Sequence, residues 1–174
     1  MEAVQFLVDS VFAIVVFAFL LRVLLQLVRA DFRNPLAQAV VALTNWLVLP
    51  LRRLLPPAGR FDTASFVALL AVQLVATLVL FRLRTAVVYP FVPLLAASLR
   101  QLANATLLLY TILIFAQAIL SFVPGARSPV NALLDALCEP VLRPFRRVLP
   151  IVGGLDFSPL VAILLLTALR ILLL

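Results

Sequence analysis

The sequence has no histidine and no lysine, and its 174 residues include one cysteine, Cys138. The side chain most often used for acid–base catalysis and for metal or haem ligation is therefore missing. A single cysteine excludes an internal disulfide, and we expect Cys138 to be a buried small residue rather than a reactive thiol. The sequence also lacks a glycine-rich phosphate-binding loop. These absences predict a protein that is not an enzyme, with no catalytic residues, no cofactor and no metal site.

Charge is scarce as well. Charged residues make up 12% of the chain and hydrophobic residues 66%, and the mean hydropathy is +1.24. A soluble domain of this size needs far more charge to cover its surface, so we predict an all-α integral membrane protein. Fourteen arginines against seven carboxylates give a net charge of +7. In a membrane protein this excess concerns orientation and anionic lipid headgroups, and no nucleic-acid partner is expected.

Four apolar segments are candidate transmembrane helices: Val4–Val28, Thr63–Phe81, Leu102–Val123 and Phe157–Leu174. The last has eighteen residues, which reach roughly 27 Å, just under the ~30 Å hydrocarbon core of a bilayer. The first segment follows acidic residues, Glu2 and Asp9, where a signal peptide has positive charge. We therefore interpret it as a retained first span.

A thirty-residue stretch occurs twice, 94 positions apart and without a gap, because residues 33–62 align with residues 127–156 at eleven identical positions. The identities include charges, prolines and a glycine, so they mark a duplicated structural unit. We predict a parallel tandem repeat of span, interfacial helix and span, with repeats at 1–81 and 102–174 and a connector at 82–101. Two structures fit the connector: a helix opened by Pro93 that runs into the third span, or a shallow dip into the interface.

The arginines also predict the orientation. The two repeat loops, 29–62 and 124–156, hold nine of them, whereas the connector holds three and the extreme termini none. Arginine-rich short loops stay in the cytoplasm. We therefore expect both repeat loops in the cytoplasm, and both termini and the connector on the outside.

Each repeat loop begins with a helix-start signal. Asn34 and Ser128 are good N-caps, and each precedes a proline at the first helical position. The helix that follows is largely apolar on one side, and in the second copy polar residues recur at every fourth position: Asn131, Asp135, Glu139 and Arg143. Such a helix is expected to lie in the membrane surface with its apolar face down.

A short element between two prolines is expected next, at 50–56 and at 144–150. Each copy carries a pair of arginines, which are Arg52, Arg53, Arg146 and Arg147. A charge near an anionic membrane surface contributes about 1 kcal/mol, so the pairs are candidates for binding lipid headgroups or a partner. Glycines are then expected in a turn, Gly59 and Gly153, and aspartates as N-caps of the following spans, Asp62 and Asp156.

Polar residues inside the spans are few. An arginine such as Arg22 costs about 2.5–3.5 kcal/mol at mid-membrane. Three explanations fit it: snorkelling to the cytoplasmic headgroups, pairing within the helical bundle, or a place in a transport path. Arg170 lies four residues from the end of the chain, which favours snorkelling. Asn104 and Gln117, together with Gln73, are expected to hydrogen-bond between helices.

The doubled pattern of Asn/Ser-Pro followed by Pro-x-Arg-Arg-x-Leu-Pro-x-x-Gly-x-x-Asp resembles the YggT family of small bacterial membrane proteins, which has relatives in plastids. The segments at 143–150 and 153–159 are close to the second copy of the family. In the first copy Trp46 stands where the second has Pro140, and Arg60 where it has Gly154. The resemblance implies a place in the bacterial inner membrane and links to osmotic tolerance and ion uptake, to envelope organisation, or to cytochrome complex assembly in plastids. It implies no catalytic residues.

Two functions fit these observations. The first is a non-enzymatic scaffold or assembly factor that docks on anionic headgroups and on another membrane protein through the paired-arginine loops. The second is an oligomeric channel or ion-uptake component, since four spans cannot enclose a sizeable pore in one monomer. The channel requires Arg22, Asn104 or Gln117 to line a path, whereas the scaffold requires the loop arginines.

Overall fold

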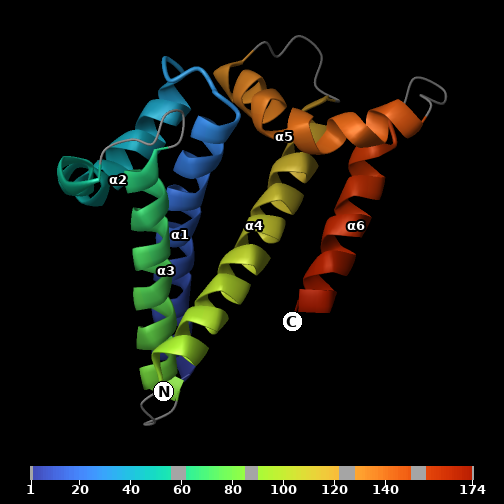
Figure 1. Cartoon of the computed structure of the whole chain (residues 1–174). Coiled ribbons are helices and arrows are strands. Elements are labelled where there is room, and N and C mark those ends of the chain that lie inside the picture. Colours follow the sequence, from blue (N-terminus) through green and yellow to red (C-terminus); the bar gives the residue numbers. More distant parts are fainter. Residues whose placement is uncertain (1, 56–61, 85–89, 122–127, 150–155, 174) are drawn as a thin grey trace. The chain divides into compact units, whose positions relative to one another are not determined.

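The computed structural model describes residues 2–55, 62–84, 90–121, 128–149 and 156–173, and these ranges contain six α-helices. Figure 1 labels them in chain order. They are α1 (Glu2–Leu27), α2 (Pro35–Leu54), α3 (Thr63–Arg84), α4 (Phe91–Ser121), α5 (Pro129–Val148) and α6 (Ser158–Leu173). The prediction of an all-helical chain is therefore confirmed.

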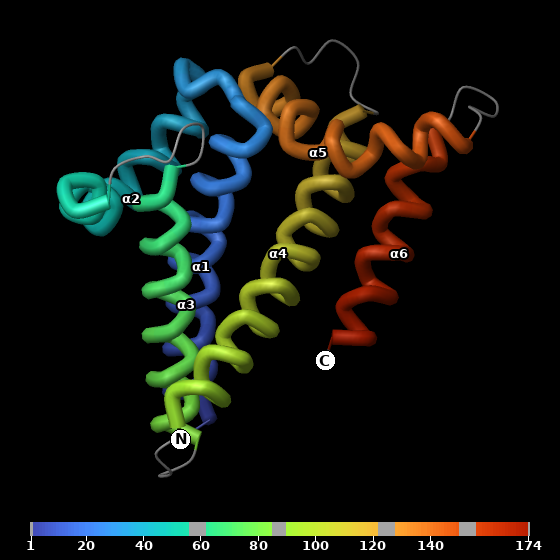
Figure 2. Tube along the Cα trace, viewed as in Figure 1, coloured from blue at the N-terminus to red at the C-terminus, as the bar shows by residue number. Residues whose placement is uncertain are grey.

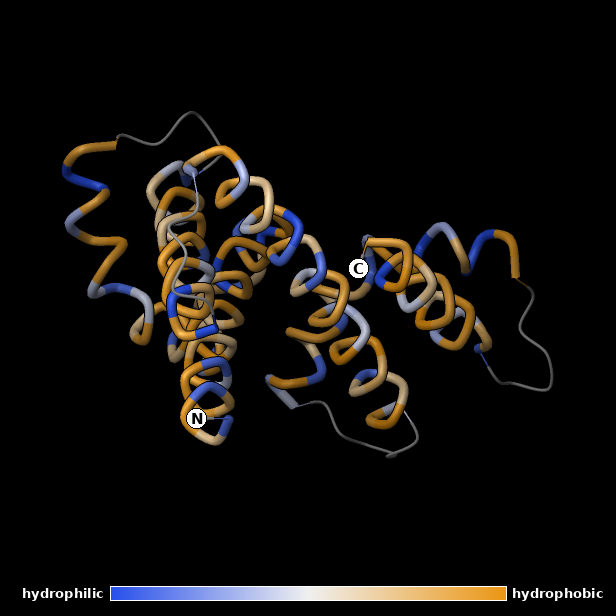
Figure 3. The backbone as a smooth tube through the Cα atoms, turned by 90° about the horizontal axis from the view of Figure 1, so that it is seen from below, coloured by the Kyte–Doolittle hydropathy of each residue, from blue (hydrophilic) through white to orange (hydrophobic). Residues whose placement is uncertain are grey.

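Three of the described helices are long and apolar enough to cross a membrane, namely α1, α3 and α4, with 26, 22 and 31 residues. The fourth expected span is the shorter apolar helix α6 of 16 residues. Figure 3 shows hydrophobic residues along most of the helical length, with hydrophilic residues in short stretches. The lengths and compositions of α1, α3 and α4 are those of helices that can span a membrane.

The helix boundaries differ from the sequence prediction at the connector. Helix α3 continues to Arg84, and α4 begins at Phe91, eleven residues before the expected start of the third span. The connector is thus mostly helical, and Pro93 lies in the first turn of α4, where its missing N–H costs no hydrogen bond. At the other end α6 begins at Ser158, and Leu174 lies outside the described residues.

The described parts of the expected proline-bounded elements are not separate from the preceding helices. Both arginine pairs lie in the last turns of longer helices, because α2 runs through Pro50 and α5 runs through Pro140 and Pro144. A proline inside a helix removes one backbone hydrogen bond and bends the helix without necessarily ending it. Figure 2 shows α5 changing direction partway along its length. The predicted turns at Gly59 and Gly153 lie outside the described residues.

The chain divides into two compact units. Unit 1 comprises residues 1–26 and 40–103, and unit 2 comprises residues 27–39 and 104–174. In unit 1, α1 and α3 lie side by side and antiparallel (Figure 1), and the Gln5 side chain near the start of α1 donates to the Leu83 carbonyl near the end of α3. The C-terminal half of α1 supplies much of the buried surface of this unit, including Phe19 and Leu25.

Unit 2 packs the second part of α4 against α5 and α6. Its core consists of residues that are at most 8% exposed: Ile114, Cys138, Leu142, Ala162 and Leu166. The start of α2 also belongs to this unit, where the Asn34 amide donates to the Pro129 carbonyl at 2.6 Å. The first turns of the two repeated helices therefore contact each other.

Candidate functional site

Arg22 is the most buried charged residue among those described, with 1% of its surface exposed. Its Nη1 donates to the Thr44 hydroxyl at 2.7 Å, to the Asn45 amide oxygen at 2.9 Å and to the Val41 carbonyl at 3.2 Å. Its Nε donates to the Ser65 hydroxyl at 3.0 Å. One guanidinium on α1 thus joins α2 and α3.

Ser65 extends this network to a carboxylate. Its hydroxyl accepts from Arg22 and donates to Asp62 Oδ2 at 2.8 Å. The Gln26 amide, one turn after Arg22 on α1, donates to Asp62 Oδ2 at 2.9 Å. Because a hydroxyl is both donor and acceptor, Ser65 connects the buried cation to an anion at the start of α3 without a direct ion pair.

This geometry favours one of the three explanations of Arg22. The guanidinium is 1% exposed and enclosed by α2 and α3, so it does not extend out of the bundle as a snorkelling side chain would. A buried cation is retained when its donors are matched by acceptors, as they are here. Arg22 is therefore paired within the bundle. Arg170, which was also expected to snorkel, donates from Nε to Asn104 Oδ1 at 2.9 Å.

The same ion pair occurs in both repeats. Arg52 pairs with Asp62 in unit 1, and Arg146 pairs with Asp156 in unit 2 at 2.9 Å. Each pair joins the last turn of a surface helix to the residues that precede the next apolar helix. Arg146 also pairs with Glu139 at 2.8 Å, one feature that the first copy lacks because Asn45 occupies that position.

These pairs shift the acidity of both aspartates. Burial raises the pKa of the Asp62 carboxyl, but hydrogen bonds from Arg52, Ser65 and Gln26 outweigh burial and bring the pKa to about 2. Burial likewise opposes a lower pKa at Asp156, and hydrogen bonds from Ser158 and Arg146 outweigh it there too. Both carboxyls are therefore charged at neutral pH.

The second arginine of each pair behaves differently. Arg53 and Arg147 are exposed, and neither has an ion-pair partner among the described residues. Next to them, Leu54 and Val148 are 77% and 81% exposed. Each repeat thus presents one arginine and one large apolar side chain outwards at the same positions, and the sequence alone did not separate the two arginines of a pair.

Three of the four predicted caps lie at the N-cap position of a helix. The Asn34 side chain accepts from the Leu36 N–H at 2.9 Å, and the Ser128 hydroxyl accepts from the Asn131 N–H at 3.3 Å. Asp62 directly precedes α3 and accepts from the Ser65 N–H at 3.4 Å. Asp156 lies two residues before α6 and accepts from the Ser158 N–H, so it stands one position further out than a cap.

The polar residues of the spans contact other helices. Gln73 on α3 donates to the Gln101 side chain on α4 at 3.0 Å, and Gln117 on α4 donates to Asp135 on α5 at 2.6 Å. Asn104 accepts from Arg170 as described above. These contacts fix helices to one another, and none of the three lies alone in an apolar surface.

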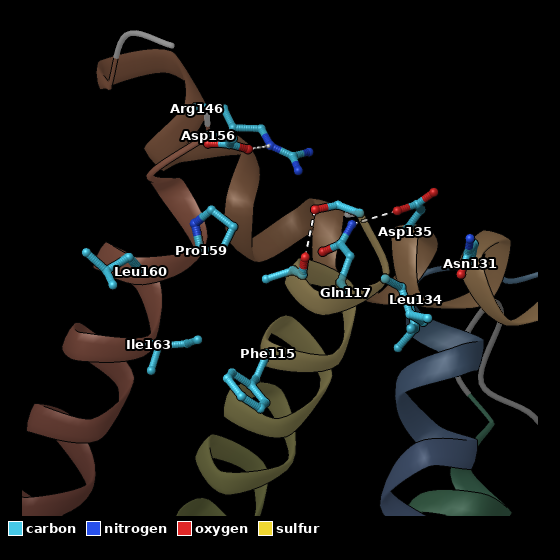
Figure 4. Close-up of a pocket in the computed structure, with 13 residues that line it drawn as sticks. Phe115, Gln117, Asn131, Leu134, Asp135, Arg146, Asp156, Pro159, Leu160 and Ile163 are labelled. Atoms are coloured by element: carbon cyan, nitrogen blue, oxygen red, sulfur yellow. Dashed lines mark hydrogen bonds and ion pairs between the residues drawn. The ribbon is translucent and has the colours of Figure 1, made fainter. Parts of the chain in front are cut away.

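Unit 2 contains a pocket of about 720 Å³ between α4, α5 and α6, shown in Figure 4. Its polar wall carries Gln117, Asp135, Arg146 and Asp156, and its apolar wall includes Phe115, Leu160 and Ile163. The fold brings to this pocket three residues that were predicted from the sequence to have separate roles: Gln117, Arg146 and Asp156.

The sequence reasoning missed the acceptors of Arg22. Thr44 and Ser65 are short hydroxyl residues within apolar helices, and each is fully buried. The available signal was in the repeat alignment, where Thr44 corresponds to Cys138 and Ser65 to Pro159 while Arg22 corresponds to Ala116. The cation and the two hydroxyls that accept from it are thus all absent from the second copy.

Comparison with known proteins places this chain in one family. A family model described as CCB3/YggT matches residues 1–83 and 96–174. The uncharacterised protein YggT of Escherichia coli strain K12 is 38% identical over 168 residues, which cover 95% of this chain and 86% of the relative. An uncharacterised protein of Pseudomonas aeruginosa is 41% identical over 147 residues, covering 83% of this chain and 75% of the relative.

A plastid relative is also similar, over a shorter part of the chain. The chloroplastic YlmG homolog protein 2 of Arabidopsis thaliana is 37% identical over 60 residues, covering 34% of this chain and 24% of the relative. No solved structure matches. The family match extends over both repeats, and the chain belongs to the CCB3/YggT family.

Proposed function

We propose that this protein is a non-enzymatic scaffold of the bacterial inner membrane, which docks on anionic lipid headgroups and on another membrane protein through the ends of α2 and α5. The observation that supports the proposal is that the two arginines of each pair differ in their contacts. Arg52 and Arg146 are engaged by aspartates, whereas Arg53 and Arg147 are exposed beside Leu54 and Val148.

A cation next to an exposed apolar side chain suits the headgroup layer. The charge attracts anionic phosphate, and the apolar neighbour enters the acyl boundary below it. The equivalent positions in the two repeats would give the protein two similar contacts on one face of the membrane. A membrane partner with acidic loops, or a second copy of this chain, would contact the same surface.

The proposed topology has four spans, with α1, α3, α4 and α6 crossing the bilayer. Helix α6 has 16 residues and reaches about 24 Å, so the bilayer thins locally around it. The distribution of arginines supports an orientation with the ends of α2 and α5 in the cytoplasm and both termini outside. Accessibility of single cysteines at Leu54, Val148 and Ala3 to a membrane-impermeant thiol reagent, in a Cys138→Ala background, tests this arrangement.

The test of docking compares the two arginines of each pair. Arg53→Glu with Arg147→Glu is expected to insert normally but to fail to complement a bacterium whose own family member is deleted. Arg53→Lys with Arg147→Lys, which keeps the charge, is expected to complement. Normal complementation by the charge-reversed variant would contradict the proposal.

A channel or ion-uptake component remains the alternative function. Potassium and sodium flux into vesicles that contain the purified protein tests it directly, with empty vesicles as the control. Flux that depends on Gln117 or Asn104 and not on Arg53 or Arg147 would favour the channel. Arg22 is a poor reporter for this purpose. Because it hydrogen-bonds to Thr44 and Ser65, its substitution is expected to destabilise the fold as well as to change any transport path.

A further inference from the structure

The pocket of unit 2 is lined in part by residues that correspond to the Arg22 network of unit 1. Moving 94 positions along the chain converts the Arg22 contacts Val41 and Ser65 into the pocket residues Asp135 and Pro159. The same shift converts Asp62 and Arg52 into the pocket residues Asp156 and Arg146. Arg22 itself corresponds to Ala116, so unit 2 has no guanidinium at that position.

The charges at the corresponding positions also differ. Unit 1 surrounds its guanidinium with neutral acceptors, among them Asn45 and the Val41 carbonyl. Unit 2 has carboxylates at the same two positions, Glu139 and Asp135, and Glu139 is paired with Arg146. Asp135 has no such cation among the described residues, an arrangement suited to a cation supplied by a ligand.

Two hydrogen-bond acceptors in the pocket can each accept from a further donor. Asp135 accepts from the Gln117 amide but has no cationic partner in the part of the chain that the structure describes. The Gln117 Oε1 atom is buried and has no hydrogen-bond partner there. Because Gln117 Nε2 points to the carboxylate, its oxygen faces away from it and offers an acceptor beside a negative charge. A buried acceptor without a donor requires an explanation.

The rest of the pocket identifies the kind of cation. Figure 4 shows Asp135, Arg146 and Asp156 toward one end of the pocket and Phe115 and Ile163 toward the other. Arg146 contacts its carboxylates through Nε and Nη1, so its third nitrogen has no acceptor among the described residues. A guanidinium has five N–H donors, and this nitrogen is suited to a phosphate oxygen. These groups suit a ligand that carries an ammonium, a phosphate and an apolar tail.

We propose that this pocket binds an aminophospholipid such as phosphatidylethanolamine. The primary ammonium donates to Asp135 and to Gln117 Oε1, the phosphate accepts from Arg146, and an acyl chain lies against Phe115, Leu160 and Ile163. The site rests on a membrane location but does not use Arg53 or Arg147, so it stands or falls separately from the headgroup docking proposed above.

Three lipids with the same acyl chains separate the contribution of the ammonium N–H donors to binding from that of the positive charge. Phosphatidylethanolamine, phosphatidylcholine and phosphatidylglycerol are titrated onto the purified protein in detergent, and bound lipid is counted by native mass spectrometry. Phosphatidylcholine keeps the positive charge but has no N–H donor, and phosphatidylglycerol has no cation. We expect phosphatidylethanolamine to bind about tenfold more tightly than either, since a charge-assisted hydrogen bond has this magnitude. Equal binding of the three lipids overturns the proposal.

Variants assign the selectivity to the pocket. Asp135→Asn is expected to lower the preference for phosphatidylethanolamine to the level of phosphatidylcholine, and Asp9→Asn, an exposed carboxylate on α1, is expected to leave it unchanged. Preference retained by Asp135→Asn, or lost equally in Asp9→Asn, would place the lipid elsewhere and contradict the site.

Discussion

Both units have the same ion pair at the end of α2 or α5, but the residues next to the pair differ. In unit 1 a guanidinium from α1 joins three helices, whereas unit 2 has a pocket of about 720 Å³ between α4, α5 and α6. The pairs Arg52–Asp62 and Arg146–Asp156 occur in both repeats, whereas the residues at the position of Arg22 and around it differ. The shared pair joins the end of one helix to the residues before the next, and the difference is the basis of the proposal that unit 2 binds a ligand.

The substitution with the largest expected effect on the stability of unit 1 is Arg22→Leu. The variant removes four hydrogen bonds from a charged donor and leaves the Thr44 and Ser65 hydroxyls in an apolar interior. Removing one partner of a buried charge network costs about 3 kcal/mol. We expect unit 1 to lose its packing at a lower temperature while unit 2 stays folded.

The chain has built-in reporters for the two units. Trp46, its one tryptophan, packs edge-on against Phe19 with ring centroids 6.2 Å apart in unit 1. Cys138 lies fully buried in unit 2, and burial, aided by Asp135, raises the pKa of its thiol to about 12. Arg22→Leu should shift the thermal transition of Trp46 fluorescence and leave Cys138 protected from a maleimide. Arg170→Leu, on α6, is the control; equal effects of both variants on Trp46 would contradict the assignment.

The fold was largely predictable because helical hydrophobicity and repeated prolines are local signals. The six helices and the duplicated loop follow from them, and so does the burial of Cys138. The role of Arg22 was not predictable from its own position, since six residues from the end of a predicted span a long side chain can reach the headgroups. Its partners lie 19 to 43 residues further along the chain, and only packing brings them together.

The arginine pairs show the same limit. In the sequence the two arginines of a pair are equivalent, and helical geometry separates them, because neighbouring residues on a helix point about 100° apart. Helix α5 also continues through Pro144, which was expected to bound a separate element. Tertiary contacts hold such a helix together, and a propensity argument does not include them.

Acid should weaken the Arg52–Asp62 ion pair, and we expect this effect to be smaller than that of Arg22→Leu. The folded-state pKa of Asp62, about 2, lies below the ordinary value of 3.8. Its stabilisation is therefore present at neutral pH and is lost as the pH falls from about 4 to about 2, a contribution of about 2 kcal/mol. We expect the Trp46 transition temperature to fall over that range, and Asp62→Asn to lower it at pH 7 and to flatten the pH dependence. A dependence unchanged in Asp62→Asn would assign the titration to another group.

Exchanging residues between the repeats sharpens the comparison further. Thr44→Cys introduces the residue of the second copy and removes the hydroxyl that accepts from Arg22 Nη1 at 2.7 Å. Since a hydrogen bond to a charged group contributes about 1.5 kcal/mol or more, we expect a drop of that size in the stability of unit 1 by Trp46 fluorescence. The reciprocal Cys138→Thr adds a hydroxyl that can bond its own helix, as Thr44 does with the Val40 carbonyl. Cys138→Thr should lower stability less than Thr44→Cys does. The reverse order would contradict the role of Arg22 in holding unit 1 together.

The smallest effect is expected where unit 1 joins α3 to α4 without any charge. Gln73 and Thr77 both donate to Gln101 Oε1, at 3.0 and 2.9 Å. Hydrogen bonds between neutral side chains in membrane helices contribute about 0.6 kcal/mol each, because the unfolded chain in the membrane also finds partners. Gln73→Leu should therefore shift the Trp46 transition by a small fraction of the Arg22→Leu effect, and Leu74→Gln, its neighbour on α3, is the control for added polarity. A shift as large as that of Arg22→Leu would mean that the neutral cluster, and not the guanidinium, holds unit 1 together.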